Sequence, residues 1–96
     1  MENLQAEEAV TIVRKILTPG VDPQKITYNQ MKGYVAIMFE SDRYRTICRL
    51  YLNNQRRKYI GILSKNKVET RYRIEVLTDI FNHSEDISAI VSLYEA

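Results

Sequence analysis

Residues 34–63, YVAIMFESDRYRTICRLYLNNQRRKYIGIL, contain three runs of apolar and aromatic residues separated by short polar segments. The runs are 34–39, about 44–52 and 58–63, and they are rich in the β-branched and aromatic residues typical of strands. Turn-forming residues separate them, at Ser41-Asp42 and at Asn53-Asn54-Gln55. Connections this short join antiparallel strands, because parallel neighbours need about a dozen residues or more to cross over. The stretch therefore predicts three strands of an antiparallel meander.

The sequence on either side of this stretch extends the sheet. Before it, Ile26 and Tyr28 alternate with polar residues, and a turn at Lys32-Gly33 leads into the strand at 34–39. After it, residues 70–74 favour a short fifth strand. We therefore predict a four- to five-stranded antiparallel β meander.

Both ends of the chain have helical spacing. In residues 4–17 the apolar positions recur at steps of three and four, with Asn3 as a predicted cap and Pro19-Gly20 ending the helix. Residues 75–81 return to helical spacing, and Ser84 is a predicted cap for a last helix. The buried stripe of that helix would be Ile87, Ile90, Val91 and Tyr94. The predicted fold class is α+β, with N-terminal and C-terminal helices packed on one face of the sheet.

Alternate residues of a strand face opposite ways, so each strand divides into two sets. One set is apolar and should lie under the helices: Val35, Ile37, Phe39, Cys48, Leu50, Leu52, Ile60 and Ile62. The other set mixes arginine with tyrosine: Tyr34, Ala36, Met38, Arg43, Arg45, Ile47, Arg49, Tyr51, Tyr59, Gly61 and Leu63. Guanidinium groups bind phosphates and aromatic rings stack on bases, which favours nucleic acid as a ligand. Cross-strand packing that only stabilises the sheet is the alternative interpretation.

Charge is concentrated in the middle of the chain. Between Arg43 and Arg73 there are ten cationic residues and one anionic residue, a formal charge of +9, whereas residues 1–42 carry −2 and residues 74–96 carry −5. The total of +2 conceals this division. A basic segment between acidic ends indicates binding to an anionic partner.

Length and composition restrict the class of protein. A chain of 96 residues is the size of one domain, so we predict a single domain over 1–96. Cys48 lies in an apolar run, which predicts a buried, reduced thiol and a cytoplasmic location. No apolar stretch approaches the roughly 20 residues needed to span a bilayer, so no membrane contact is expected.

The sequence contains no recognisable catalytic motif. We expect no catalytic residue, no metal ion and no cofactor, since glycines stand singly and the only close acids near the basic stretch, Glu40 and Asp42, suit a turn. His83 is expected to be a surface or capping residue. An independent nuclease would need a metal site built from Glu40, Asp42 and Glu69, which the sequence does not favour.

Residues 25–62 carry several short features in order: an I-x-Y strand, an aromatic-x-x-I strand at Tyr34 to Ile37, ICRL at Ile47 to Leu50 and KYIG at Lys58 to Gly61. In these features the chain resembles a small C-terminal domain of restriction-endonuclease-type proteins described as type I restriction enzyme R-subunit-like. The family's D-T-K-S-Y entry to the second strand differs here, since only Lys32 and Tyr34 match. The resemblance implies an accessory module that follows a nuclease domain, equivalent to the C-terminal end of a longer protein.

The first hypothesis is thus a noncatalytic nucleic-acid-binding or DNA-positioning accessory domain of a restriction-type endonuclease, acting on duplex DNA. Its candidate binding residues come from the basic stretch: Arg45, Arg49, Tyr51, Arg56, Arg57, Lys58, Tyr59, Lys65, Lys67 and Arg71. The second hypothesis is a protein-interaction or dimerisation module, in which the basic face docks on the parent protein's nuclease domain or on a second copy.

Overall fold

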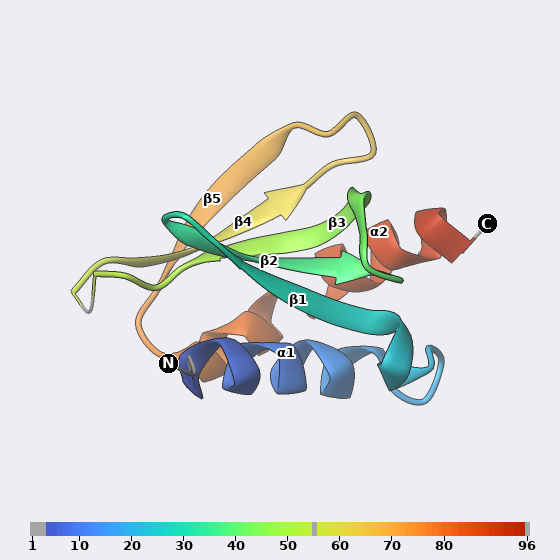
Figure 1. Cartoon of the computed structure of the whole chain (residues 1–96), viewed down its shortest axis with the longest axis horizontal. Coiled ribbons are helices and arrows are strands. Elements are labelled where there is room, and N and C mark those ends of the chain that lie inside the picture. The colour runs from blue at the N-terminus through green and yellow to red at the C-terminus, as the bar shows by residue number, and fades with distance from the viewer. Residues whose placement is uncertain (1–3, 55, 96) are drawn as a thin grey trace.

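The protein is a five-stranded sheet with helices on one side, as a computed structural model shows for residues 4–54 and 56–95 (Figure 1). The elements, in chain order, are α1 (Leu4–Leu17), a 3-10 turn (Pro23–Lys25), β1 (Ile26–Met31), β2 (Tyr34–Phe39), β3 (Asp42–Tyr51), β4 (Lys58–Leu63), β5 (Glu69–Ile74), a second 3-10 helix (Leu77–His83) and α2 (Ser84–Glu95). The predicted α+β class is confirmed, and the fifth strand forms.

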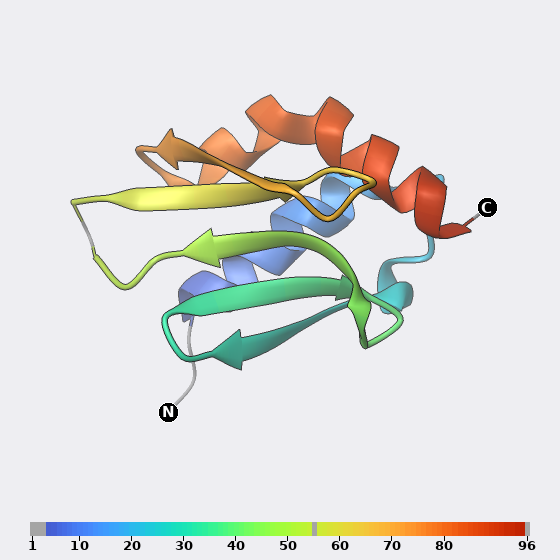
Figure 2. The ribbon, with the colours of Figure 1, turned by 90° about the horizontal axis from the view of Figure 1, so that it is seen from above.

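The strands follow one another across the sheet in the order β1-β2-β3-β4-β5, and all neighbours are antiparallel. The predicted meander is therefore correct, and Figure 2 shows it from the side that the helices leave open. Tight turns join the first strands: Gly33 has φ +92° between β1 and β2. Glu40 and Ser41 have φ of 54° and 59° between β2 and β3, so these two residues hold a left-handed turn.

The helices cover one face and form the core with it. α1 packs against β1, the second 3-10 helix and α2, and α2 also contacts β3 and β4. All eight residues predicted for the covered face are buried: Val35, Ile37, Phe39, Cys48, Leu50, Leu52, Ile60 and Ile62. The predicted stripe of α2 is also confirmed, with Ile87, Ile90 and Val91 buried and Tyr94 packed against them.

A bulge in β3 overturns the predicted position of Ile47. Cys48 pairs with Ile37, but the next partner of β2, Met38, pairs with Thr46, so Ile47 is an extra residue. Ile47 and Cys48 are both fully buried. The prediction that Ile47 lies with the arginines was wrong because strict alternation ends at the bulge. A second register shift follows between Met38 and Phe39, so strict alternation does not hold over residues 43–46. Thr46, in place of Arg45, lines the open face together with Arg49.

The chain between β5 and α2 also differs from its prediction. Residues predicted to form a helix at 75–81 instead form the 3-10 helix Leu77–His83, whose start is held by the Asp79 carboxylate. That carboxylate accepts the N–H groups of Glu75 (2.8 Å) and Val76 (3.2 Å). Ser84 has helical φ and ψ of −59° and −36°, so the backbone runs directly into α2 and Ser84 is not the predicted cap. The predicted cap at Asn3 lies outside the described residues.

Candidate nucleic-acid interface

A row of tyrosines crosses the open face of the sheet. Tyr34 on β2 and Tyr51 on β3 have ring centroids 5.7 Å apart, and Tyr51 lies opposite Tyr59 on β4. All three rings are half-buried. Their positions follow from the strand alternation, which brings every second residue to this face. The row gives the open face a group of aromatic rings near the β3–β4 end, with Tyr34 and Tyr51 tilted by 43° to each other.

A carboxylate stands beside this row and binds three of the candidate residues. Glu69 on β5 accepts hydrogen bonds from Arg49 (3.1 Å), from Arg71 (2.8 Å) and from the Tyr51 hydroxyl (2.9 Å). The Arg71 guanidinium also lies over the Tyr51 ring, 4.1 Å from its centroid, and that of Arg49 lies 5.5 Å from the Tyr34 centroid. Two cations of the open face are therefore already paired with an anion.

The same contacts set the ionisation of this cluster. Burial alone would raise the pKa of Glu69, whose side chain is 15% exposed, but the hydrogen bonds from Arg71, Tyr51 and Arg49 outweigh it and lower the pKa. Burial and the hydrogen bond to Glu69 raise the pKa of the Tyr51 hydroxyl. The hydrogen bond to Glu69 raises the pKa of Arg71. At neutral pH the carboxylate is charged, and Tyr51 and Arg71 keep their protons.

The carboxylate reaches this position because β4 has a glycine beneath it. A Cβ at Gly61 would lie 2.7 Å from the Glu69 carboxyl carbon and from Oε1. Gly61 pairs with Arg49 on one side and Arg71 on the other, so it occupies the centre of the cluster. The single glycine of β4 thus leaves room for an anion above the sheet.

Two further candidate cations also have partners. Arg45 lies 3.5 Å from Glu40 and 3.6 Å from Asp42, at the β2–β3 turn. Lys67 donates to the Tyr44 carbonyl and to the Tyr94 hydroxyl (3.2 Å). Both side chains serve the fold locally, which leaves less of their charge for a ligand.

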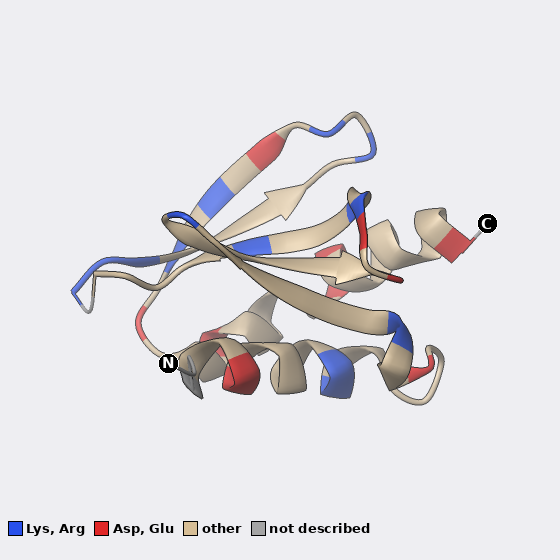
Figure 3. Cartoon of the chain, in the orientation of Figure 1, with Lys and Arg blue, Asp and Glu red and all other residues tan. Residues whose placement is uncertain are grey.

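The remaining candidate cations lie on loops. Within 4–54 and 56–95, the side chains of Arg56, Arg57, Lys58 and Lys65 have no acidic partner. Arg56, Arg57 and Lys58 are at the β3–β4 connection, and Lys65 is at the β4–β5 hairpin. Figure 3 shows blue segments at both of these connections and along β5. Arg56 and Arg57 are therefore exposed cations of the loop at the end of the tyrosine row, whereas Lys58 is half-buried as the first residue of β4 and alternates with Tyr59 to the opposite face.

A shallow depression of about 410 Å³ occupies the β1–β3 part of the open face. Its lining mixes apolar, aromatic and cationic side chains: Asn29, Met31, Tyr34, Ala36, Met38, Arg43, Tyr44, Thr46 and Arg49. Tyr44 is 69% exposed, and the Arg43 guanidinium lies 5.0 Å from its ring centroid. Tyr44 reaches this face because of the bulge at Ile47. A planar, partly anionic ligand would find stacking and ionic partners here.

Groups that catalysis would use are separated. Across the described part of the chain, no three His, Cys, Asp or Glu side chains gather as metal ligands. Glu40 and Asp42 pair with Arg45 beside the β2–β3 turn. Glu69 on β5 pairs with Arg49 on β3 and with Arg71 on β5. His83 lies 4.8 Å from the Tyr72 ring. Cys48 is free and fully buried, and burial raises the pKa of its thiol to about 12.

No protein-family model, curated protein or solved structure matches this chain. None of the described helices is long and apolar enough to cross a membrane.

Sequence reasoning missed the central role of Glu69. The residue was considered as the single acid among ten cations and as a disfavoured metal ligand, although its isolation among cations was itself a signal that they would gather around it. The pairing spans three strands, from Arg49 through Gly61 to Arg71, and depends on register. Tyr44 was missed for a different reason, since only the bulge brings it to the open face.

Proposed function

We propose that the domain binds nucleic acid without catalysing a reaction, through the open face of its sheet. The observation that supports this most strongly is the group Arg56, Arg57 and Lys58, which has no acidic partner among the described residues and adjoins a half-buried row of tyrosines. Unpaired cations on a loop lose little on meeting a phosphate, because no existing ion pair has to break.

Each part of the face has a distinct role in this proposal. Arg56, Arg57 and Lys58 contact phosphates, which gives affinity without sequence specificity. Tyr51 and Tyr59 lie against the ligand beside them, and the Glu69 cluster holds Tyr51 in place. Arg49 and Arg71 are held by Glu69, so they contribute less to affinity than their charge suggests. Duplex DNA held by its backbone fits this division of roles.

The resemblance to restriction-type endonucleases suggests the kind of protein in which this domain would act. In that setting the domain positions DNA for a nuclease active site located in another domain. The link to restriction enzymes rests on the short sequence features alone.

A salt titration tests the proposal. Affinity for a labelled duplex should fall linearly with the logarithm of salt concentration, with a slope of about −0.9 per phosphate contacted. Changing Arg56 and Arg57 together to alanine should weaken binding and make the slope shallower by roughly 1 to 2. The matched control changes Lys15 and Lys25, two exposed cations outside the open face, to alanine, and should alter neither value.

Two results would contradict the proposal. One is the absence of DNA binding at low salt, and the other is an equal loss in the control variant. If the face instead docks on an acidic protein surface or a second copy, sedimentation would show concentration-dependent association that DNA does not change.

A further inference from the structure

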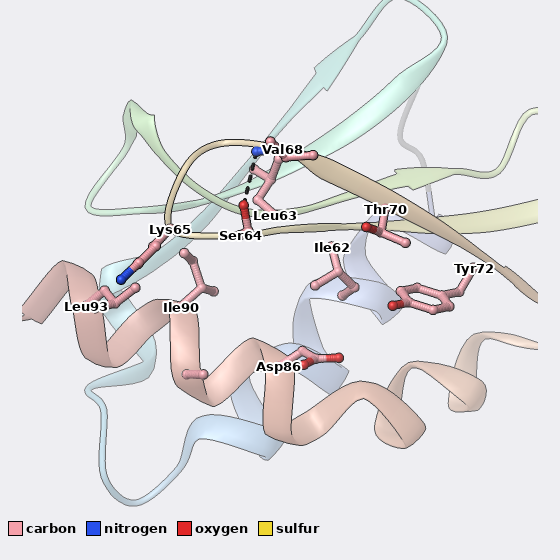
Figure 4. A pocket seen from close by; sticks show the side chains of 11 residues that line it. Ile62, Leu63, Ser64, Lys65, Val68, Thr70, Tyr72, Asp86, Ile90 and Leu93 are labelled. Carbon is pink, nitrogen blue, oxygen red and sulfur yellow. Dashed lines mark hydrogen bonds between the residues drawn. The ribbon is translucent and has the colours of Figure 1, made fainter.

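A second surface lies away from the open face, between β5 and α2. Figure 4 shows a groove there, with β4 and β5 forming one wall and α2 the other. Its volume is about 270 Å³, and its lining is largely apolar. Three of the lining side chains are strongly exposed, with Val68 at 63%, Leu93 at 50% and Tyr72 at 41%. Apolar side chains this exposed along one groove indicate an interaction surface.

The wall formed by β5 has a free backbone edge. β5 is the last strand in the sheet order, and the Ser64 N–H donates to the Val68 carbonyl at 3.0 Å, next to the β4–β5 ladder. Pairs in an antiparallel ladder alternate between hydrogen-bonded and non-hydrogen-bonded. Counting along β5 from Val68, the backbone N–H and C=O groups of Thr70 and Tyr72 point to β4. Those of Arg71 and Arg73 point away from the sheet. The outward N–H and C=O groups are able to pair with another strand.

An added strand would place its side chains in two rows. One row would lie beside Thr70 and Tyr72 and enter the groove against α2, where apolar side chains fit. The other row would lie beside Arg71 and Arg73 on the outer side, where acidic side chains would share the two guanidinium groups with Glu69 and Glu75. The groove therefore favours a segment in which apolar and acidic residues alternate.

The charged residues at the ends of the groove and on β5 further restrict the kind of molecule that could bind there. Lys65 lies at the Leu93 end, and Asp86 lies at the Tyr72 end, so acids suit the first end better than the second. A second copy of this chain is a poor occupant. Antiparallel pairing of β5 with itself sets Arg71 opposite Arg71 or Arg73 in the registers centred on Arg71 and on Tyr72, and like charges directly opposite destabilise a sheet. The register centred on Thr70 sets Arg71 opposite Glu69 but brings Arg73 opposite Lys67, which is again a pair of like charges.

We propose that the β5–α2 groove binds an extended acidic peptide with alternating apolar residues, which joins the sheet as a sixth strand. The groove lies apart from the tyrosine row, but the outer side-chain row would lie beside Arg71 and Arg73 on the open face. The proposal does not depend on nucleic-acid binding. Binding of this kind draws affinity from main-chain hydrogen bonds and selectivity from the side chains that enter the groove.

The probe is a fluorescein-labelled peptide of alternating valine and glutamate, long enough to pair along all of β5. A peptide of equal composition, with its valines and glutamates in two blocks, controls for charge alone. Fluorescence anisotropy should show about tenfold tighter binding of the alternating peptide. Amide shifts should change along β5 and α2 and stay constant at Tyr34 and Tyr51.

Two pairs of variants separate the contribution of the groove side chains from that of backbone pairing along β5. Leu93→Asp should weaken binding by about fivefold or more, whereas Phe81→Asp, at an exposed position outside the groove, should leave it unchanged. Arg71→Pro removes an outward N–H and should abolish binding, whereas Arg71→Ala loses the same guanidinium but keeps the N–H and should retain most of it. Leu93→Asp should bind DNA as the wild type does.

Equal affinity for the alternating and block peptides would overturn the proposal, as would shift changes at Tyr34 that exceed those along β5 and α2. Equal loss in Arg71→Pro and Arg71→Ala would show that no strand is added. Association of the protein with itself through β5, detected by sedimentation without peptide, would identify a second copy as the occupant and would also overturn it.

Discussion

At the scale of single residues, Glu69 controls the properties of the open face. It holds Arg49, Tyr51 and Arg71 in fixed positions and offsets part of the charge of the basic stretch. The formal charge of that stretch is therefore not the charge that a ligand meets on the sheet. The exposed cations of the β3–β4 loop contribute more to the local field than the arginines of the strands.

Replacing Glu69 with glutamine should have opposite effects on stability and on DNA binding. The free energy of unfolding should fall by about 1–3 kcal/mol, because hydrogen bonds to a charged group are lost or weakened. DNA affinity at low salt should rise, since Arg49 and Arg71 lose their anion. Urea unfolding and the duplex titration measure the two effects. Glu75→Gln, at a side chain 81% exposed, is the matched control and should change stability by less than about 0.5 kcal/mol.

The stability that Glu69 provides should depend on pH. The pKa of this carboxyl is lower in the folded protein than in the unfolded chain, where it is about 4.3. Its contribution is therefore fully present above that value and is lost as the pH falls through the folded-state pKa. The difference in unfolding free energy between wild type and Glu69→Gln should narrow below about pH 4. A difference that stays constant from neutral to strongly acidic pH would contradict this.

At the scale of elements, the strands were predictable and their irregularities were not. β2 and β4 have the predicted bounds, because runs of apolar, β-branched and aromatic residues between turn residues mark the ends of short strands clearly. Ile47 was assigned to the wrong face because a bulge inserts a residue without changing composition. The neighbouring apolar pair Ile47 and Cys48 was the one available sign. The 3-10 helix at Leu77–His83 and the helical Ser84 depend on packing, which propensity does not report.

Tyr94 joins three elements and should contribute measurably to stability. Its hydroxyl donates to the Thr46 carbonyl at 2.6 Å and accepts from Lys67, so it ties α2 to β3 and to the β4–β5 hairpin. Tyr94→Phe should reduce the free energy of unfolding by about 1–2 kcal/mol, because a partly buried carbonyl loses its donor. Urea unfolding measures the change. Tyr28→Phe, at an exposed ring on β1, should have little effect, and equal losses in the two variants would contradict the assigned role.

At the scale of the whole molecule, Cys48 reports on the integrity of the core. Its side chain is fully buried beneath the helices, and burial raises the pKa of its thiol to about 12. In the folded state a reagent cannot reach the thiol, and the thiolate that would react does not form. Reaction with a thiol-specific disulfide reagent should therefore follow the urea unfolding transition measured by circular dichroism. Rapid modification in the absence of urea would show that the helical layer opens independently of the sheet.

The chain-neighbour order of the strands has a consequence for folding. Every strand pairs with the strand before or after it, so the sheet can form by closing short loops, which is fast. The apolar layer beneath it is different, because α1 packs against the second 3-10 helix and α2 from the other end of the chain. We expect the hairpins to form first and the two ends to meet last. Until they do, the apolar face of an otherwise paired sheet stays open to water, and a chain without α1 would remain in that aggregation-prone state.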